Sequence, residues 1–226
     1  MKTLHQVLIC GAVILSLMFL HNTSQAMNFD FSKADQINQW KDLAGTMAIA
    51  DGLLCSMKDA GGPLVSMVKD WKNEWADYTI TVKAQGLVAD ADWGISFRVK
   101  DIANFYSWQF CNGNLMFVTY VGGARTEAWK VAQAEVLNTW QDYKVVVKGN
   151  KFDLYFGGKL SQSVTHDALK TGSVGTFVWI NGGTKLGNHG GVAFDDFSVD
   201  GTGIPGALTA VELSGKLAVT WAEIKK

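Results

Sequence analysis

The stretch WADYTITVK at residues 75–83 recurs as WQDYKVVVK at residues 140–148. In both copies Tyr, a β-branched residue and Val occupy alternate positions, with mostly Thr or Lys between them, which is the period-two pattern of a strand with one buried face. The Trp-x-Asp that opens each copy is typical of a chain that enters a sheet from a turn. The repeat therefore predicts two equivalent strands, which we expect to be matching elements of two facing sheets.

The first 26 residues are predicted to be a signal peptide. Lys2 precedes an apolar run at residues 7–20, and the polar stretch that follows ends in Ser24-Gln25-Ala26, a small-x-small cleavage pattern. The apolar run is shorter than the roughly 20 residues that a membrane-spanning helix needs. We therefore expect a protein that is secreted or held in the periplasm or cell envelope, without a transmembrane anchor.

The rest of the chain has the composition of one all-β domain. The sequence holds 24 Gly, 12 Phe and 9 Trp but only 2 Pro, and turn signals such as Asp51-Gly52 and Asn112-Gly113 separate its short strand-like runs. Its formal net charge of −1, with no basic patch, gives no sign of nucleic-acid binding. The sequence predicts a two-sheet antiparallel jelly-roll sandwich at residues 27–201.

The composition changes after Gly201. Residues 202–208 have the Gly and Pro content of a linker, and residues 209–226 fit one short amphipathic helix. This segment is either a tail that docks on the sandwich or frays, or a contact for another protein.

Two cysteines follow the leader, Cys55 and Cys111. Both lie in apolar, strand-like runs of a chain that we expect to be exported. A disulfide between them and two buried free thiols are both open.

Several short motifs occur in the order in which they occur in the concanavalin A-like lectin/glucanase superfamily. They are Phe29-Asp30-Phe31, Trp40, Asp51-Gly52, residues 75–78, 94–98 and 104–106, and Phe194-Asp195-Asp196. In this respect the chain resembles that superfamily, and most of all its laminin-G-like and 3-keto-disaccharide hydrolase-type bacterial modules. The resemblance implies a sandwich over nearly all of the chain beyond the leader, but this superfamily includes lectins, adhesion modules and hydrolases alike.

No catalytic constellation stands out. The glucanases of the superfamily carry a Glu-x-Asp-x-x-Glu strand, which this chain lacks, and the corresponding strands carry Arg98 and Tyr106 instead. Beyond the leader the histidines are His166 and His189, and neither belongs to a metal-spaced His or Cys cluster. Catalytic residues therefore stay unknown, and a binding function is favoured.

A carbohydrate-binding surface is predicted on the strands at residues 93–99 and 104–111. Its residues are Arg98, Tyr106 and Trp108, and Gln109 is a reserve candidate for the same surface. An Arg within an otherwise apolar strand needs a partner, which we expect to be a ligand or a carboxylate. A guanidinium beside two aromatic rings suits a sugar, because its ring stacks on aromatics while its hydroxyls bind polar groups.

The pairing register of these two strands decides whether that surface exists. If Val99 lies opposite Phe105, then Arg98 lies beside Tyr106 on an open face. A register shifted by one residue would instead bury Tyr106, Trp108 and Phe110. Both registers are compatible with the sequence.

The closing strand suggests a metal site. Val192 and Phe194 share one parity, whereas Phe197 and Val199 share the other, so we expect a bulge at Asp195-Asp196. These carboxylates, together with Asp30 of the first strand, would supply oxygen ligands for a structural Ca²⁺, and members of the resembling superfamily often hold such an ion. The alternative is that these aspartates cap a turn and contact water or Lys.

Three functions remain open. The favoured one is a secreted, non-catalytic module that binds a glycan or polysaccharide. The second is a glycoside hydrolase or lyase that acts on modified or keto-disaccharides, and the third is a structural or adhesion module of an extracellular or envelope assembly that makes its contact through the C-terminal helix.

Overall fold

The computed structural model describes residues 26–57, 62–72, 75–89, 91–180, 190–201 and 203–205. The predicted signal peptide, apart from Ala26, and the predicted C-terminal helix at residues 209–226 lie outside these ranges, as does most of the predicted linker. In the described part of the chain no helix is long and apolar enough to cross a membrane.

The described residues form two antiparallel sheets, as the sequence predicts. The eight-stranded sheet has the order β13-β12-β11-β6-β15-β4-β3, and β1 pairs with β15. Its strands are β1 (Met27–Phe29), β3 (Met47–Ala50), β4 (Leu53–Ser56), β6 (Tyr78–Gly86), β11 (Gln141–Lys148), β12 (Lys151–Phe156), β13 (Lys159–Thr165) and β15 (Val192–Gly201).

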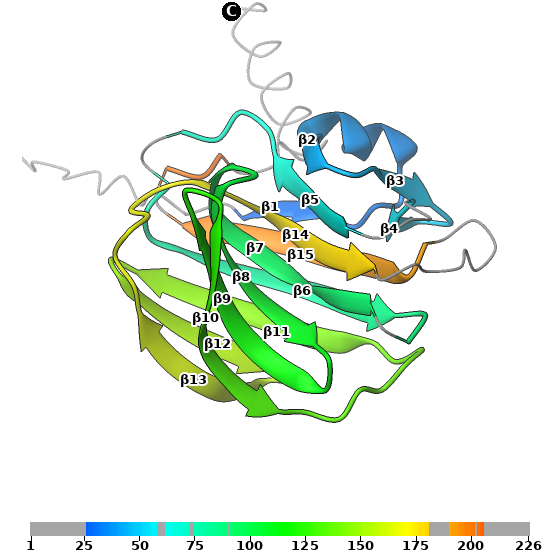
Figure 1. Cartoon of the computed structure of the whole chain (residues 1–226). Coiled ribbons are helices and arrows are strands. Elements are labelled where there is room, and N and C mark those ends of the chain that lie inside the picture. The colour runs from blue at the N-terminus through cyan, green and yellow to red at the C-terminus, as the bar shows by residue number, and fades with distance from the viewer. Residues whose placement is uncertain are drawn as a thin grey trace, which may run out of the picture.

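The second sheet has seven strands in the order β10-β9-β8-β7-β14-β5-β2. Its strands are β2 (Trp40–Ala44), β5 (Gly62–Val68), β7 (Ala91–Asp101), β8 (Asn104–Cys111), β9 (Asn114–Val121), β10 (Ala124–Ala132) and β14 (Ser173–Ile180). Figure 1 shows the two sheets as stacked layers, with β8 and β9 crossing in front of β6 and β11. This arrangement is a concanavalin A-like jelly-roll sandwich.

Alternating side chains of the two sheets fill the space between them. In β6 the inward positions are Tyr78, Ile80, Val82 and Ala84, all buried, and the positions between them are more exposed. Trp93, Trp108 and Phe117 face these residues from the other sheet and are almost fully buried. Burial of this apolar and aromatic surface is the main force that holds the two layers together.

The repeated phrase does form two equivalent strands, but they do not belong to facing sheets as predicted. β6 and β11 are neighbours in the eight-stranded sheet, with Tyr143 opposite Val82 and Tyr78 opposite Val147. An identical inward pattern suits adjacent antiparallel strands equally well, because both then present Tyr and Val to the same core. The alternating pattern therefore shows which face of each strand is buried, but it does not show which strand pairs with it.

Three elements lie where the sequence suggests only connections. The 3-10 helix η1 (Ala34–Gln39) and β2 occupy a polar stretch around Trp40 that shows neither helical nor strand periodicity. β13 lies at an edge of its sheet, and most of its side chains are exposed or half-buried. Edge strands lack a second neighbour and so carry a weak hydrophobic alternation.

The two cysteines lie in different sheets and are both free thiols, Cys55 on β4 and Cys111 on β8. Burial raises the pKa of each thiol to about 12. Of the two possibilities left open by the sequence, the structure has the buried free thiols.

Candidate functional site

The pairing of β7 with β8 removes the binding surface expected from the sequence. Phe97 lies opposite Tyr106 and Ile95 opposite Trp108, which is the register that turns both aromatic residues inward. Tyr106 and Trp108 are completely buried in the core. The prediction of an open face built from Arg98, Tyr106 and Trp108 is therefore wrong. Both faces of β8 are buried, so the two registers bury almost equal apolar surface and the sequence alone does not distinguish them.

Arg98 is held by the backbone at one end of the sandwich. Its backbone φ is +54° at the point where the pairing of β7 shifts register, and its side chain is fully buried. The guanidinium donates hydrogen bonds to the carbonyls of Lys170, Gly149 (2.8 Å) and Trp75 (3.5 Å). Its Cζ lies 5.6 Å from the centre of the Tyr78 ring. The sequence led us to expect a ligand or a carboxylate as the partner of Arg98. Its guanidinium instead contacts backbone carbonyls and the Tyr78 ring.

The Tyr106 hydroxyl binds the segment that connects β13 to β14, close to Arg98. It accepts a hydrogen bond from the backbone N–H of Leu169 (2.7 Å) and lies 2.7 Å from Nδ1 of His166. Because the hydroxyl already accepts from Leu169, its proton is free to bond to His166. This side chain therefore ties the segment between β13 and β14 to the core.

Replacing Tyr106 by Phe is expected to lower the free energy of unfolding by about 1–2 kcal/mol, since the buried N–H of Leu169 loses its partner. Urea denaturation followed by tryptophan fluorescence measures the change. Tyr155→Phe is the matched control, because Tyr155 is partly exposed on the other sheet, and we expect it to stay within about 0.5 kcal/mol of the parent. An equal effect of both substitutions would contradict this role for Tyr106.

A second apolar cluster lies on the outer face of the seven-stranded sheet, away from the core. Its buried floor consists of Val65, Met67, Val99, Phe105 and Phe177, and its partly buried rim consists of Leu43, Trp71, Tyr120 and Trp179. We call these nine residues the outer aromatic patch. Phe105 and Tyr120 stack with ring centres 4.2 Å apart and an interplanar angle of 12°.

Partly exposed aromatic rings are what a sugar-binding face needs, because sugar C–H groups pack on aromatic faces. In the outer aromatic patch three such rings, Trp71, Tyr120 and Trp179, border a floor that water does not reach. The floor holds the rim in place, since Phe105 and Phe177 each lie 6.1 Å or less from Tyr120, measured between ring centres. This arrangement presents preformed apolar contacts on an outer surface.

Polar groups accompany the patch on the same face. Gln109, the predicted reserve residue, lies here, almost fully buried, and accepts a hydrogen bond of 2.5 Å from the Ser107 hydroxyl. Asp92 is the direct cross-strand partner of Trp179 and is only 8% exposed. Burial raises the pKa of Asp92, and a hydrogen bond from the Cys111 thiol opposes that rise. Asp92 Oδ1 has no hydrogen-bond partner among the described residues.

The neighbouring edge strand β10 adds paired charges. Arg125 Nη1 lies 2.8 Å from Glu127 Oε1, and Lys130 Nζ lies 3.3 Å from Glu127 Oε2. Arg125 is also the cross-strand partner of Tyr120. The outer aromatic patch thus has a polar border that can bind hydroxyl groups.

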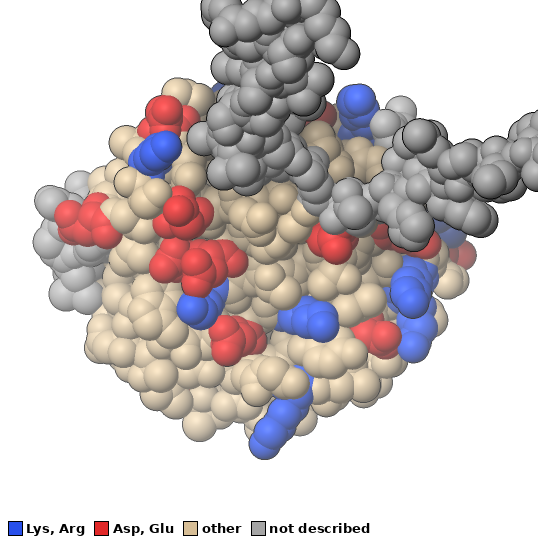
Figure 2. All heavy atoms as spheres, turned by 180° about the vertical axis from the view of Figure 1, so that it is seen from behind, with Lys and Arg blue, Asp and Glu red and all other residues tan. Residues whose placement is uncertain are grey.

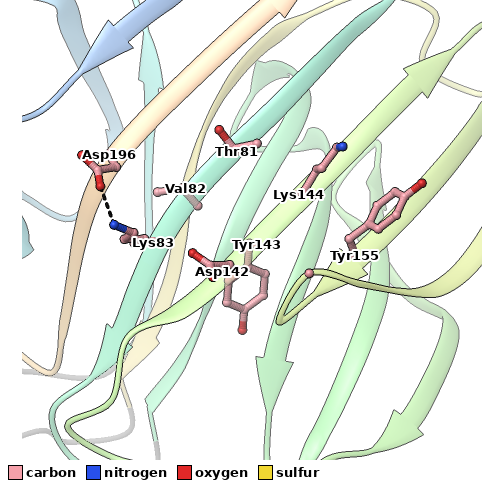
Figure 3. A pocket seen from close by; sticks show the side chains of 9 residues that line it. Thr81, Val82, Lys83, Asp142, Tyr143, Lys144, Tyr155 and Asp196 are labelled. Atoms are coloured by element: carbon pink, nitrogen blue, oxygen red, sulfur yellow. Dashed lines mark hydrogen bonds and ion pairs between the residues drawn. The ribbon is translucent and has the colours of Figure 1, made fainter.

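The opposite outer face carries a shallow hollow of about 380 Å³ on the eight-stranded sheet, shown in Figure 3. Two contacts make this hollow less suitable for binding a sugar, because they occupy side chains that line it. Lys83 Nζ lies 2.7 Å from Asp196 Oδ2, which pairs both charges and raises the pKa of Lys83. Lys144 Nζ lies over the Tyr155 ring, 5.0 Å from its centre, and so covers one ring face. We call this feature the Tyr155 hollow.

Figure 2 shows the molecule from behind, with acidic and basic side chains interspersed and no large field of one sign. Such mixed charge is typical of an ordinary solvated surface. Because Lys83 and Lys144 at the Tyr155 hollow already contact Asp196 and Tyr155, the outer aromatic patch is the stronger candidate site of the two faces.

The three predicted calcium ligands lie at the β1 and β15 strands. The expected bulge is confirmed, because the pairing of β15 with β6 shifts register between Asp195 and Ser198. Asp30 Oδ1 accepts hydrogen bonds from Ser32 and Gln36, and Asp196 pairs with Lys83. Within the described ranges no group of three His, Cys, Asp or Glu side chains is placed to hold a metal. Calcium binding by Asp30, Asp195 and Asp196 stays a prediction.

Sequence reasoning missed the outer aromatic patch, although a signal exists in retrospect. In β14 the residues Val174, Val178 and Ile180 share the inward parity, whereas Phe177 and Trp179 share the outward one. Two large aromatics on the outward parity of a central strand indicate a second apolar surface.

Comparison with known proteins supports the fold. No protein-family model and no curated protein sequence matches the chain. Among solved structures, the carbohydrate binding module CBM66 from Bacillus subtilis superposes with a TM-score of 0.62 at 17% identity, covering 72% of this chain and 96% of that one. The carbohydrate recognition domain of Emp47p superposes with a TM-score of 0.56 at 11% identity, covering 79% and 94%.

One similar structure is part of a larger protein. The GH43 protein BlXynB from Bacillus licheniformis has a TM-score of 0.56 at 18% identity, and the match covers 76% of this chain but only 39% of that protein. At these identities the likeness establishes the shared sandwich fold.

Proposed function

We propose that the protein is a secreted, non-catalytic module that binds a carbohydrate chain on the outer aromatic patch. The observation that carries this proposal is the set of partly exposed rings, Trp71, Tyr120 and Trp179, on a preformed apolar floor. Polar groups at the border of the patch, above all Asp92 and Arg125, would bind sugar hydroxyls and fix the orientation of the chain. Two structures with this fold, CBM66 and the Emp47p domain, are described as carbohydrate-binding, which supports the proposal.

The proposal is tested by affinity electrophoresis of the protein in gels that contain levan, inulin, xylan, β-glucan, chitosan or no polysaccharide. We expect slower migration in at least one polysaccharide gel and no release of reducing sugar from the same polymer. Unchanged migration in every gel would contradict the proposal. Release of reducing sugar would instead support the glycoside hydrolase considered in the sequence analysis.

A further inference from the structure

A buried carboxylate oxygen on the outer face has no hydrogen-bond partner within the described ranges. Asp92 lies beside Trp179 in the strand pairing, is 8% exposed, and its Oδ1 receives no hydrogen bond from the described residues. A buried charged oxygen without a partner costs more than any other unpaired polar group. Such a group needs an explanation, and a ligand or ion that completes it is one of them.

The charges around Asp92 favour a cationic partner. Both basic groups on β10, Arg125 and Lys130, are directed to Glu127 at 2.8 and 3.3 Å. A second carboxylate, Glu135, acts on Asp92 in the direction that raises its pKa, whereas Arg125 acts in the opposite direction. Glu135 lines an adjacent hollow of about 360 Å³ together with Ala91, the residue before Asp92. Two acidic groups therefore border this end of the patch.

An aromatic ring lies next to the acid. Trp179 is partly exposed, and its backbone pairs directly with that of Asp92. Tryptophan is the aromatic side chain that attracts cations most strongly. A sugar that stacks on Trp179 would thus bring a substituent at its ring edge toward the Asp92 carboxylate.

From this juxtaposition we infer that the outer aromatic patch selects a sugar with a protonated amino group, the ammonium bound by Asp92 and the ring packed on Trp179. The inference rests on the proposed carbohydrate-binding function and specifies its ligand class. An ammonium that reaches the exposed edge of this carboxylate forms a charge-assisted hydrogen bond with it. A neutral sugar would supply only a hydroxyl.

The test is isothermal titration of the whole protein with two matched probes, the β-1,4-linked trimers of glucosamine and of N-acetylglucosamine, in mildly acidic buffer. We expect the glucosamine trimer to bind at least about tenfold more tightly, since acetylation removes the charge that Asp92 binds. Asp92→Asn should abolish this preference. Glu135→Gln should reduce it by a smaller factor.

Asp142→Asn is the matched control, because Asp142 is a carboxylate on the outer face of the other sheet and lines the Tyr155 hollow (Figure 3). It should leave the preference unchanged. Equal affinity for the two trimers, or an unaltered preference in Asp92→Asn, would overturn the inference. If a neutral polysaccharide binds at the patch and the glucosamine trimer does not, only the amino-sugar inference fails. If no carbohydrate binds, the proposed function fails as well.

Discussion

Replacing Arg98 by methionine is expected to lower the free energy of unfolding by about 3–5 kcal/mol. Methionine keeps most of the length of the side chain but donates no hydrogen bond, so the carbonyls of Gly149, Lys170 and Trp75 lose the hydrogen bonds from the guanidinium. A hydrogen bond from a charged donor contributes about 1.5–3 kcal/mol. Denaturation in urea, followed by tryptophan fluorescence, measures the loss.

The chain offers a matched control for this substitution. Its other arginine, Arg125, lies on the exposed strand β10 with a side chain that is 39% accessible and paired to Glu127. Solvent screens that ion pair, so Arg125→Met should cost less than about 1 kcal/mol. The account would be contradicted if Arg98→Met were as stable as the parent and had instead lost its affinity for a polysaccharide.

Replacing Tyr120 by alanine is expected to weaken binding of the retained polysaccharide at least about tenfold in a protein that remains folded. The substitution removes a partly exposed ring from the rim of the outer aromatic patch and uncovers Phe105, on which that ring stacks at 4.2 Å. Aromatic contacts at the centre of an interface typically contribute about 2 kcal/mol or more. Affinity electrophoresis at several polysaccharide concentrations gives the dissociation constants.

Two control variants show whether the loss of binding comes from the Tyr120 ring itself. Tyr120→Phe keeps the stacked ring and should bind nearly as well as the parent. Tyr155→Ala removes the equivalent residue type from the opposite outer face, where it lines the Tyr155 hollow, and should leave binding unchanged. Weaker binding in Tyr155→Ala but not in Tyr120→Ala would move the site to the other sheet.

The sequence is sufficient to predict the sandwich and several of its hairpins. The turns at Asp51-Gly52 and Asn112-Gly113 join paired strands as expected, because these residues adopt the positive φ that tight turns need. The bulge at Asp195-Asp196 was also predictable from the change of parity along β15. Such signals are local, and neighbouring residues alone determine them.

The candidate site depends on information that is not local. Alternation along one strand does not show that β6 and β11 are neighbours, nor which register β7 and β8 adopt when both faces are apolar. The role of Arg98 depends on carbonyls of residues 75, 149 and 170, which are far away in the sequence. The same holds for the outer aromatic patch, whose residues come from six strands and a loop.

The most direct test of the proposed site is a titration of ¹⁵N-labelled protein with an oligosaccharide of the retained polymer, followed by backbone amide NMR. The account predicts that shifts concentrate at Asp92, Tyr120 and Trp179 and their strand neighbours on the seven-stranded sheet. Shifts that concentrate instead around the Tyr155 hollow on the eight-stranded sheet would contradict it.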